Sequence, residues 1–521
     1  MAKKESMAIC TLLGAFLIHA IIGTIHTRSK TYIYSYLSEI SIVKFSKLYL
    51  DILFSISNMI YNIFILIGVI LTAYYNSLTI SGIGLAIRVL CNSTLILLPD
   101  IRIVSVAILL SGASCGLVFL PILLDIWKYF PKTKGVSTAF VLSGLGITRL
   151  IFKYVTNALI NPEGVGLKTG TYRYPKEINE SYLIYLKQSQ IFFAGLSVLA
   201  IVLIYPYDIY VRLSIEEKKL EKKLESKKRK KGDLPRSQSS VQLTRFEDNI
   251  DKNADEVEAP SYLKLLFKVK SKKIENEEMQ VYEPLLSLIV SYPFLQLTSV
   301  FFFATVYGVL ELASMRRLGL LFGLREDFLW KTSLGWKIIN VCFFSLWGYY
   351  LDKIGIKKIL MITLTAEIVN DALCYFIVRF KIGFIFFTFL SAAINSANLS
   401  LIPTCYAMIF GDEKGLLLYS ISAILINSIH ICQPIINNLV NDKVYYLMFF
   451  LITTVFSMFA LIILCFFVEK KHVYKEEIIH QRKESYFKRA SELSDLDTNN
   501  EEDSSCDNSL FKGIDDKKEE I

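Results

Sequence analysis

Several charged residues interrupt long apolar runs of the chain, and their positions suggest ligand chemistry. Arg149 follows the sequence SGLGIT near the middle of an apolar stretch, and Lys153 lies one turn further on the same helix face. An ionised side chain at the centre of a bilayer costs about 2.5–3.5 kcal/mol, so it is expected to serve a function. We therefore expect Arg149 to bind an anion, with Lys153 or Lys337 assisting. The alternative is a structural ion pair with an acid such as Glu367 or Asp125.

A second group of polar residues suggests proton transfer or hydrogen bonding inside apolar segments. Glu367 and Asp371 stand four residues apart, and a buried carboxyl group of this kind can carry a proton. His19 and His430 would titrate near neutrality if water reached them. The alternative for the two acids is a packing pair, and for each histidine a hydrogen-bonded structural role. Two asparagines could line a cavity or join helices, namely Asn395 and Asn427.

Motifs for other chemistries are absent from the sequence. The nine cysteines are scattered and form no C-x-x-C pair, so we expect neither a disulfide framework nor a metal site. Nucleotide-binding loops and nucleophile elbows are also missing, which argues against ATP-driven transport. The sequence therefore predicts no catalytic residues and no cofactor, and the chain is not expected to be an enzyme.

The elements that must position these residues are apolar segments long enough to cross a membrane. The chain has 521 residues, of which 53% are hydrophobic, and a spanning helix needs about 20 apolar residues. The fold class predicted is an all-α polytopic membrane protein with 12 transmembrane helices in two six-helix halves. The predicted spans are 7–27, 52–74, 79–98, 103–126, 135–158, 189–211, 289–311, 329–351, 357–379, 382–410, 415–437 and 444–468.

Charge and polarity divide the chain into four parts. These are an N-terminal six-helix half (1–211), a polar linker (212–285), a C-terminal six-helix half (286–468) and an acidic tail (469–521). The start of the linker alternates acids and bases, which suits a solvated helix, and the rest of the linker and the tail are expected to be disordered. The bases behind the net charge of +9 cluster in the linker and beside helix ends. This distribution predicts that both termini are cytosolic and gives no indication of nucleic-acid binding.

A short charged island lies between the predicted eighth and ninth spans. Gly355 permits a tight turn there. Asp352 could cap the next helix or pair with a neighbouring base. The island follows a spaced pattern, namely Gly348, Asp352, Lys353, Gly355, Lys357 and Lys358. The equivalent place in the first half, IGVILTAYYNSLTISG from Ile67, keeps Gly68 and has lost the acid and the bases.

This pattern resembles the cytoplasmic loop signature of the major facilitator superfamily, in which it locks the inward gate. Further stretches resemble the monocarboxylate transporter and oxalate/formate antiporter branch, most of all its protozoan members. They include WKYFPKTKGVSTAFVLSGLGI (Trp127 to Ile147) and REDFLWKTSLGWKIIN (Arg325 to Asn340). Members of that branch often carry an arginine where this chain has Phe344, while Asn340 matches their pattern. The resemblance implies an organic-anion carrier without the usual anion ligand.

The expected function is secondary-active transport of a small organic anion, such as a monocarboxylate, by alternating access. Proton coupling and exchange both remain open. The alternatives are a carrier of amino acids or other small metabolites, or a transporter-like receptor or scaffold. We expect a monomeric transport unit in a lipid bilayer, with the plasma membrane favoured over an organelle. The sequon Asn179-Glu180-Ser181 falls in a predicted outer loop, where glycosylation would be possible.

Overall fold

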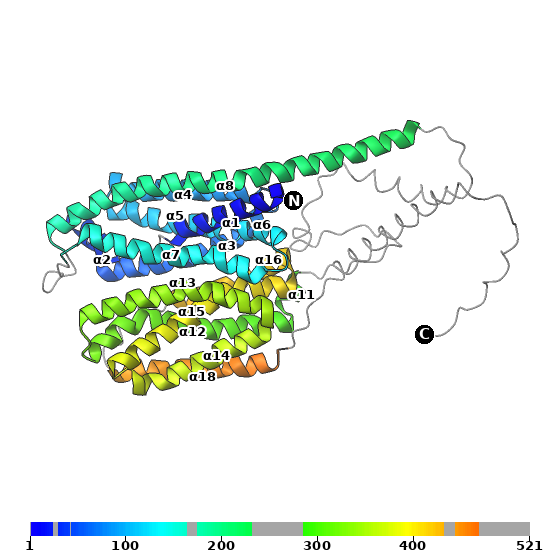
Figure 1. Ribbon diagram of the computed structural model, residues 1–521. Coiled ribbons are helices and arrows are strands. Elements are labelled where there is room, and N and C mark those ends of the chain that lie inside the picture. The colour runs from blue at the N-terminus through cyan, green and yellow to red at the C-terminus, as the bar shows by residue number, and fades with distance from the viewer. Residues whose placement is uncertain are drawn as a thin grey trace, which may run out of the picture. The chain divides into compact units, whose positions relative to one another are not determined.

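A computed structural model describes residues 2–23, 30–41, 43–163, 174–231, 285–431 and 443–467, which are nearly all helical (Figure 1). Residues Met1–Glu469 belong to one compact unit. In the first half of the chain the helices are α1 (Ala2–Gly23), α2 (Lys30–Ile40), α3 (Lys47–Leu71), α4 (Ser77–Leu97), α5 (Ile101–Phe119), α6 (Pro121–Tyr129), α7 (Lys134–Ile160) and α8 (Lys176–Lys231).

The second half repeats this use of long helices. Its elements are α11 (Leu285–Ile289), α12 (Tyr292–Leu321), α13 (Glu326–Ile354), α14 (Ile356–Ile377), α15 (Lys381–Phe410), α16 (Asp412–Ile426), the 3-10 helix η3 (Asn427–Ile431) and α18 (Lys443–Cys465). The predicted linker is helical as far as Lys231, as its alternating charges suggested. Residues 232–284 of the linker and the tail from 468 onward lie outside the described residues.

Among the residues that the structure describes, eight helical segments are long and apolar enough to cross a membrane by length and composition. They are α1, α3, α4, the α5–α6 pair, α7, α8 as far as Pro206, α15, and α18 from Met448. The described parts of the other four predicted spans also fall on helices, but α13 and α14 carry several charged residues and α16 has only 15 residues. Residues 432–437 of the span 415–437 lie outside the described residues. The count of twelve spans and the cytosolic termini therefore stay predictions.

The fourth predicted span is broken in two by a proline. Pro121 begins α6 directly after Leu120, and it has no backbone N–H to continue the ladder of α5. The amide of Leu123 accordingly bonds to the carbonyl of Leu120 at 2.9 Å, which leaves the carbonyl of Phe119 open to another donor. This kink lies in the most buried of the candidate spans.

Helix α2 was not predicted, because its sequence KTYIYSYLSEI is short and mixed in polarity. It lies against the start of α8, where Ser35 donates to Asn179 Oδ1 at 2.9 Å and Asn179 Nδ2 donates to Glu39. Tyr32 stacks on Tyr174 with a centroid distance of 4.8 Å. Asn179 is buried, so the expectation that its sequon is open to glycosylation is not supported.

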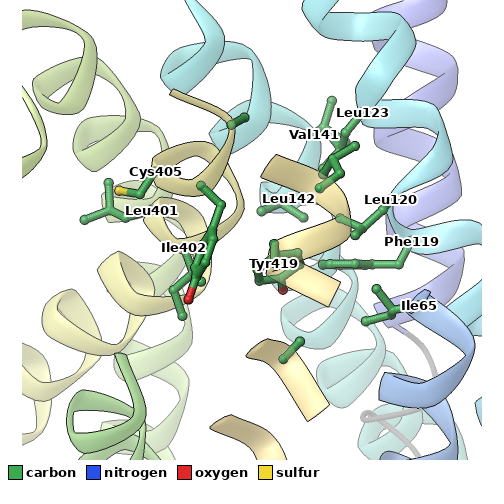
Figure 2. Packing of buried hydrophobic residues seen from close by; sticks show 14 of the residues in the cluster. Ile65, Phe119, Leu120, Leu123, Val141, Leu142, Leu401, Ile402, Cys405 and Tyr419 are labelled. Atoms are coloured by element: carbon green, nitrogen blue, oxygen red, sulfur yellow. The ribbon is translucent and has the colours of Figure 1, made fainter. Parts of the chain in front are cut away.

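The largest hydrophobic cluster contains residues from both halves of the chain. Trp127 and Leu142 of the first half and Phe344, Leu401 and Tyr419 of the second are all buried in it. Figure 2 shows Tyr419 of α16 among Leu142, Phe119 and Ile65 on one side and residues of α15 on the other. The two halves are therefore held together by a shared apolar cluster. A few polar residues, described in the next subsection, lie within this interface.

Candidate functional site

Glycines bring α7 close to helices of both halves. A Cβ at Gly144 would meet the carbonyl oxygen of Phe16 in α1 at 2.5 Å, and one at Gly146 would meet Val341 of α13 at 2.7 Å. Phe344 is buried beside Gly146 and so fills the space between α7 and α13. Phe344 thus occupies an apolar packing position in this chain.

The Asp352 end of α13 is joined to the first turn of α7. Asp352 accepts hydrogen bonds from the amides of Gly135 and Val136, at 2.8 and 2.9 Å. Gly135 and Gly348 face each other so closely that a Cβ on Gly135 would lie 2.5 Å from the carbonyl oxygen of Gly348. The acid therefore caps a helix of the opposite half rather than the following helix α14. We call this region, residues 134–136 with Gly348 and Asp352, the gate contact.

Burial at the gate contact raises the pKa of Asp352, against the two amide hydrogen bonds, which lower it. A carboxyl group whose pKa is raised holds its proton more tightly than an exposed aspartic acid. Because burial raises this pKa, a lower pH favours the arrangement with Asp352 buried over one with Asp352 in water.

The basic residues of the motif do not cross between the halves. Lys357 donates to the carbonyl oxygens of Cys465 and Phe467, each at 2.8 Å, and so caps the end of α18. Lys353 lies 5.7 Å from the centroid of the Tyr349 ring, and Lys358 is exposed. Gly355, with a φ of 87°, makes the turn between α13 and α14 in the backbone region that favours glycine.

Arg149 lies in α7, about halfway between the gate contact and the far end of the helix. Its Nε atom is buried and has no hydrogen-bond partner among the described residues. Neither acid that was considered as its partner contacts it, because Glu367 accepts from Ser457 and Asp125 accepts from Lys128 at 3.1 Å. Within the described part of the chain, Arg149 forms no ion pair with a carboxylate.

Lys337 of α13 lies against the same turn of α7. Its Nζ donates to the carbonyl oxygen of Arg149 at 3.1 Å, so the structure brings together two cationic residues from opposite halves. Lys153 lies on α7 one turn beyond Arg149, but its side chain is outside what the structure describes.

Tyr61 was not predicted as a site residue, yet it lies near Arg149, and Tyr419 in turn lies near Tyr61. Tyr61 of α3 interacts electrostatically with Arg149, with Cys115 and with Tyr419 of α16. Tyr419 is buried, and its ring lies 6.0 Å from that of Tyr406. A phenol hydroxyl donates a hydrogen bond, so Arg149 with Tyr61 beside it could hold an anion. No charge marks either tyrosine in the sequence, where they look like ordinary apolar-core aromatics.

The candidate asparagines have different surroundings. Asn427, at the start of η3, donates to Asn62 Oδ1 of α3 and to the carbonyl oxygen of Ala423, both at 3.0 Å, and so joins the two halves. Asn340 donates to the carbonyl oxygen of Ala392 at 3.1 Å and ties α13 to α15. Asn395 faces α12, where a Cβ on Gly308 would meet its Oδ1. Only Asn427 among them is placed at a contact between the halves.

His19 supports the kink in the fourth span. Its side chain is fully buried, with Nδ1 at 2.9 Å from the carbonyl oxygen of Ala15 and Nε2 at 3.1 Å from that of Phe119. Phe119 is the residue whose carbonyl the proline break leaves open. The geometry therefore favours the structural alternative for His19 over ligand binding.

The proposed proton carriers lie at a helix contact within the second half. Thr453 of α18 donates to Asp371 Oδ2 at 2.5 Å, and Ser457 of the same helix donates to Glu367. Both acids are buried between α14 and α18. This arrangement supports the packing-pair alternative. His430 lies in η3, and its contacts are not among those described.

Arg88 is another buried cation that the sequence analysis did not weigh, although it stands inside a predicted span. It is 3% exposed and donates from Nη1 to Ser111 of α5. With Ser57 and Asn92 it lines a small cavity within the first half. The described residues hold no cluster of metal-binding side chains.

Comparison with solved structures places the helices in a known arrangement. The proton:xylose symporter XylE, solved with bound 6-bromo-6-deoxy-D-glucose, superposes with a TM-score of 0.58 at 14% identity, covering 89% of this chain and 96% of that one. The transporter FucP, solved in an outward conformation, gives a TM-score of 0.54 at 10% identity, covering 86% and 97%. The chain has the fold of the major facilitator superfamily. The facilitator fold is thus shown by structure, whereas the monocarboxylate branch and the protozoan likeness rest on sequence motifs alone.

No protein-family model and no curated protein sequence matches the chain. The facilitator fold therefore limits the architecture without naming a substrate, because one fold serves many functions.

Proposed function

We propose that the chain is a secondary-active transporter that carries a small organic anion of the monocarboxylate type by alternating access. The observation that carries the proposal is Arg149, which lies in a helix packed against the opposite half and forms no ion pair with a described carboxylate. The facilitator fold supports the transport part, since both compared structures are described as transporters.

The energetics favour an anionic cargo. A buried guanidinium whose Nε has no hydrogen bond pays a desolvation cost, and a carboxylate ligand would recover much of it through charge-assisted hydrogen bonds. The bound pair would also be neutral overall, which lowers the cost of holding an anion inside the bilayer.

The proposed site draws on both halves. Arg149 binds the carboxylate, Tyr61 offers a hydroxyl donor, and Lys337 ties the opposite half to the same turn. Asn427 holds α3 and η3 together beside them. Rocking of the halves about this place would expose it to each side in turn.

We further propose that the gate contact faces the cytosol, that both termini lie there, and that the monomer is the transport unit, in the plasma membrane. The basic segments beside the gate contact, such as Lys132 and Lys358, support this orientation by the positive-inside rule. Coupling to protons, through Glu367, Asp371 or His430, and exchange remain alternatives for the driving force.

The test is uptake by the full chain in a transport-deficient host, with labelled lactate, pyruvate, formate and amino acids at two pH values. Arg149→Ala is expected to weaken the apparent affinity for the anion at least about tenfold, because a hydrogen bond to a charged group is worth ~1.5–3 kcal/mol. Arg102→Ala is the matched control, since Arg102 is an exposed arginine paired with Asp100.

Uptake that survives Arg149→Ala with unchanged apparent affinity would refute the anion role. Uptake of amino acids alone would favour the alternative cargo, and proton coupling is supported only if anion uptake rises as the outside pH falls.

A further inference from the structure

The first turn of α7 receives a second acid from the opposite half. Lys134 Nζ lies 2.5 Å from Asp412 Oδ1 at the start of α16, and the two side chains are only 18% and 32% exposed. The neighbouring amides of Gly135 and Val136 bind Asp352 at the end of α13. Two helices of the second half thus attach to three consecutive residues of the first.

Lys134 does not stabilise α7 itself. The N-terminus of a helix carries a partial positive charge, so a lysine at its first residue is unfavourable there by a few tenths of a kcal/mol to ~1 kcal/mol. The first turn of α16, by contrast, holds Asp412 and Glu413, which suit that position. A residue that works against its own helix is expected to be kept for its contact with Asp412.

The first half has no charged residue at the position that corresponds to Asp352. The pattern of the second half would put a carboxylate after α3, yet the segment TAYYN from Thr72 has none. Gly68, the glycine that the first half retains, faces the carbonyl oxygen of Leu117 within its own half. The start of α16, at Gly411, has no side-chain capping bond. The end of α3 therefore gives α16 no acidic cap.

We infer that the ion pair between Lys134 and Asp412 replaces the missing first-half latch, with its charges reversed. In the second-half latch an acid binds the helix start of the other half, whereas in the replacement the helix start of α16 supplies the acid. Because both latches end on residues 134–136, opening one displaces the anchor of the other. The two latches form one cooperative gate.

This inference rests on the proposed alternating-access function for its meaning, but its test needs no substrate. Hydrogen–deuterium exchange of residues 134–140 is measured on the full chain in lipid nanodiscs. We expect faster exchange in Asp412→Asn and in Lys134→Met, on the order of two- to fivefold, the range for a partly exposed ion pair. Asp352→Asn is expected to raise the exchange rate about tenfold, since this variant loses charge-assisted hydrogen bonds to two amides.

The decisive variant combines Asp352→Asn with Asp412→Asn. A cooperative gate predicts that the double variant exchanges less than the product of the two single effects, because either change already frees the shared turn. Lys134→Arg keeps the charge and should match the unaltered chain. Lys132→Met is the matched control, because Lys132 is exposed on the same loop.

Wild-type exchange in Asp412→Asn would overturn the replacement latch, and a double effect equal to the product would overturn the coupling. Both outcomes are independent of whether any anion is carried. If no anion is taken up but the double variant exchanges less than the product of the single effects, the proposed function is refuted and the cooperative gate is supported.

Discussion

Lys337 of α13 donates a hydrogen bond to the carbonyl oxygen of Arg149 in α7, with the two atoms 3.1 Å apart. The bond links the backbone of the proposed anion ligand to the opposite half of the protein. In the proposed transport cycle α7 and α13 move with different halves, so this bond would link the position of Arg149 to that movement.

Variants of Lys337 should distinguish the effect of its hydrogen bond to Arg149 from the effect of its positive charge alone. We expect Lys337→Met to weaken the apparent affinity for the transported anion on the order of tenfold, since it removes a hydrogen bond from a charged donor. Lys337→Arg should retain most of the affinity. The concentration dependence of uptake measures both, and Lys331→Met, an exposed lysine on the same helix, is the control. An equal loss in Lys337→Met and Lys331→Met would contradict the role.

The glycine at the gate contact should tolerate no side chain. A Cβ on Gly348 would press on the backbone of Gly135, which has little freedom to move away. We expect Gly348→Ala to prevent closure and to reduce the maximal uptake rate several-fold. Gly195→Ala is the matched control, because a Cβ there would meet nothing within 4 Å. That control should keep full uptake and gain about 0.5–1 kcal/mol of stability, as alanine favours a helix over glycine.

His19 should affect stability rather than affinity. His19→Ala removes the contacts to two carbonyl oxygens and leaves a cavity beside the kink, which we expect to cost about 2–4 kcal/mol of unfolding free energy. Thermal unfolding in detergent measures the loss. An unchanged melting temperature together with a weakened apparent affinity would instead support ligand binding.

The acids of α14 offer a direct choice between packing and proton coupling. We expect Asp371→Ala to lower the unfolding free energy by about 1–3 kcal/mol, because it removes the hydrogen bond with Thr453 and leaves a cavity between α14 and α18. Asp371→Asn keeps an acceptor at that position and should be milder. Uptake measured at two pH values distinguishes packing from proton coupling. If Asp371→Asn loses the pH dependence of uptake but keeps its stability, Asp371 carries a proton.

The sequence predicted the helices well because apolar length leaves a strong signal. Within the described residues, each predicted span falls mainly on a helix or on a pair of helices, while the ends of spans 7–27, 415–437 and 444–468 lie outside them. It did not predict the break at Pro121 or the short helix α2, because local packing and tertiary contacts determine these features. Sequence spacing also suggested that Asp352 caps the following helix, whereas the structure places it on α7, more than 200 residues earlier in the chain.

The charged residues of the candidate site could be predicted from the sequence, whereas the uncharged ones could not. Arg149 and Lys337 stood out because charges are rare in apolar runs, and the structure brings them together. Tyr61 and Tyr419 carried no such signal, since an aromatic residue in a span usually packs in the core. The proximity of Tyr61 to Arg149 depends on how α3 and α7 pack in the first half, which a single sequence does not encode as a local pattern.

Helix α8 has a mechanical consequence. Its apolar part ends near Pro206, and the helix then continues to Lys231 without interruption. About 25 further residues, at 1.5 Å each, make a rod of roughly 37 Å outside the bilayer. A tilt of the first half by about ten degrees would swing the tip of this lever by roughly 6 Å, so a small rotation inside the membrane becomes a large displacement where the linker begins.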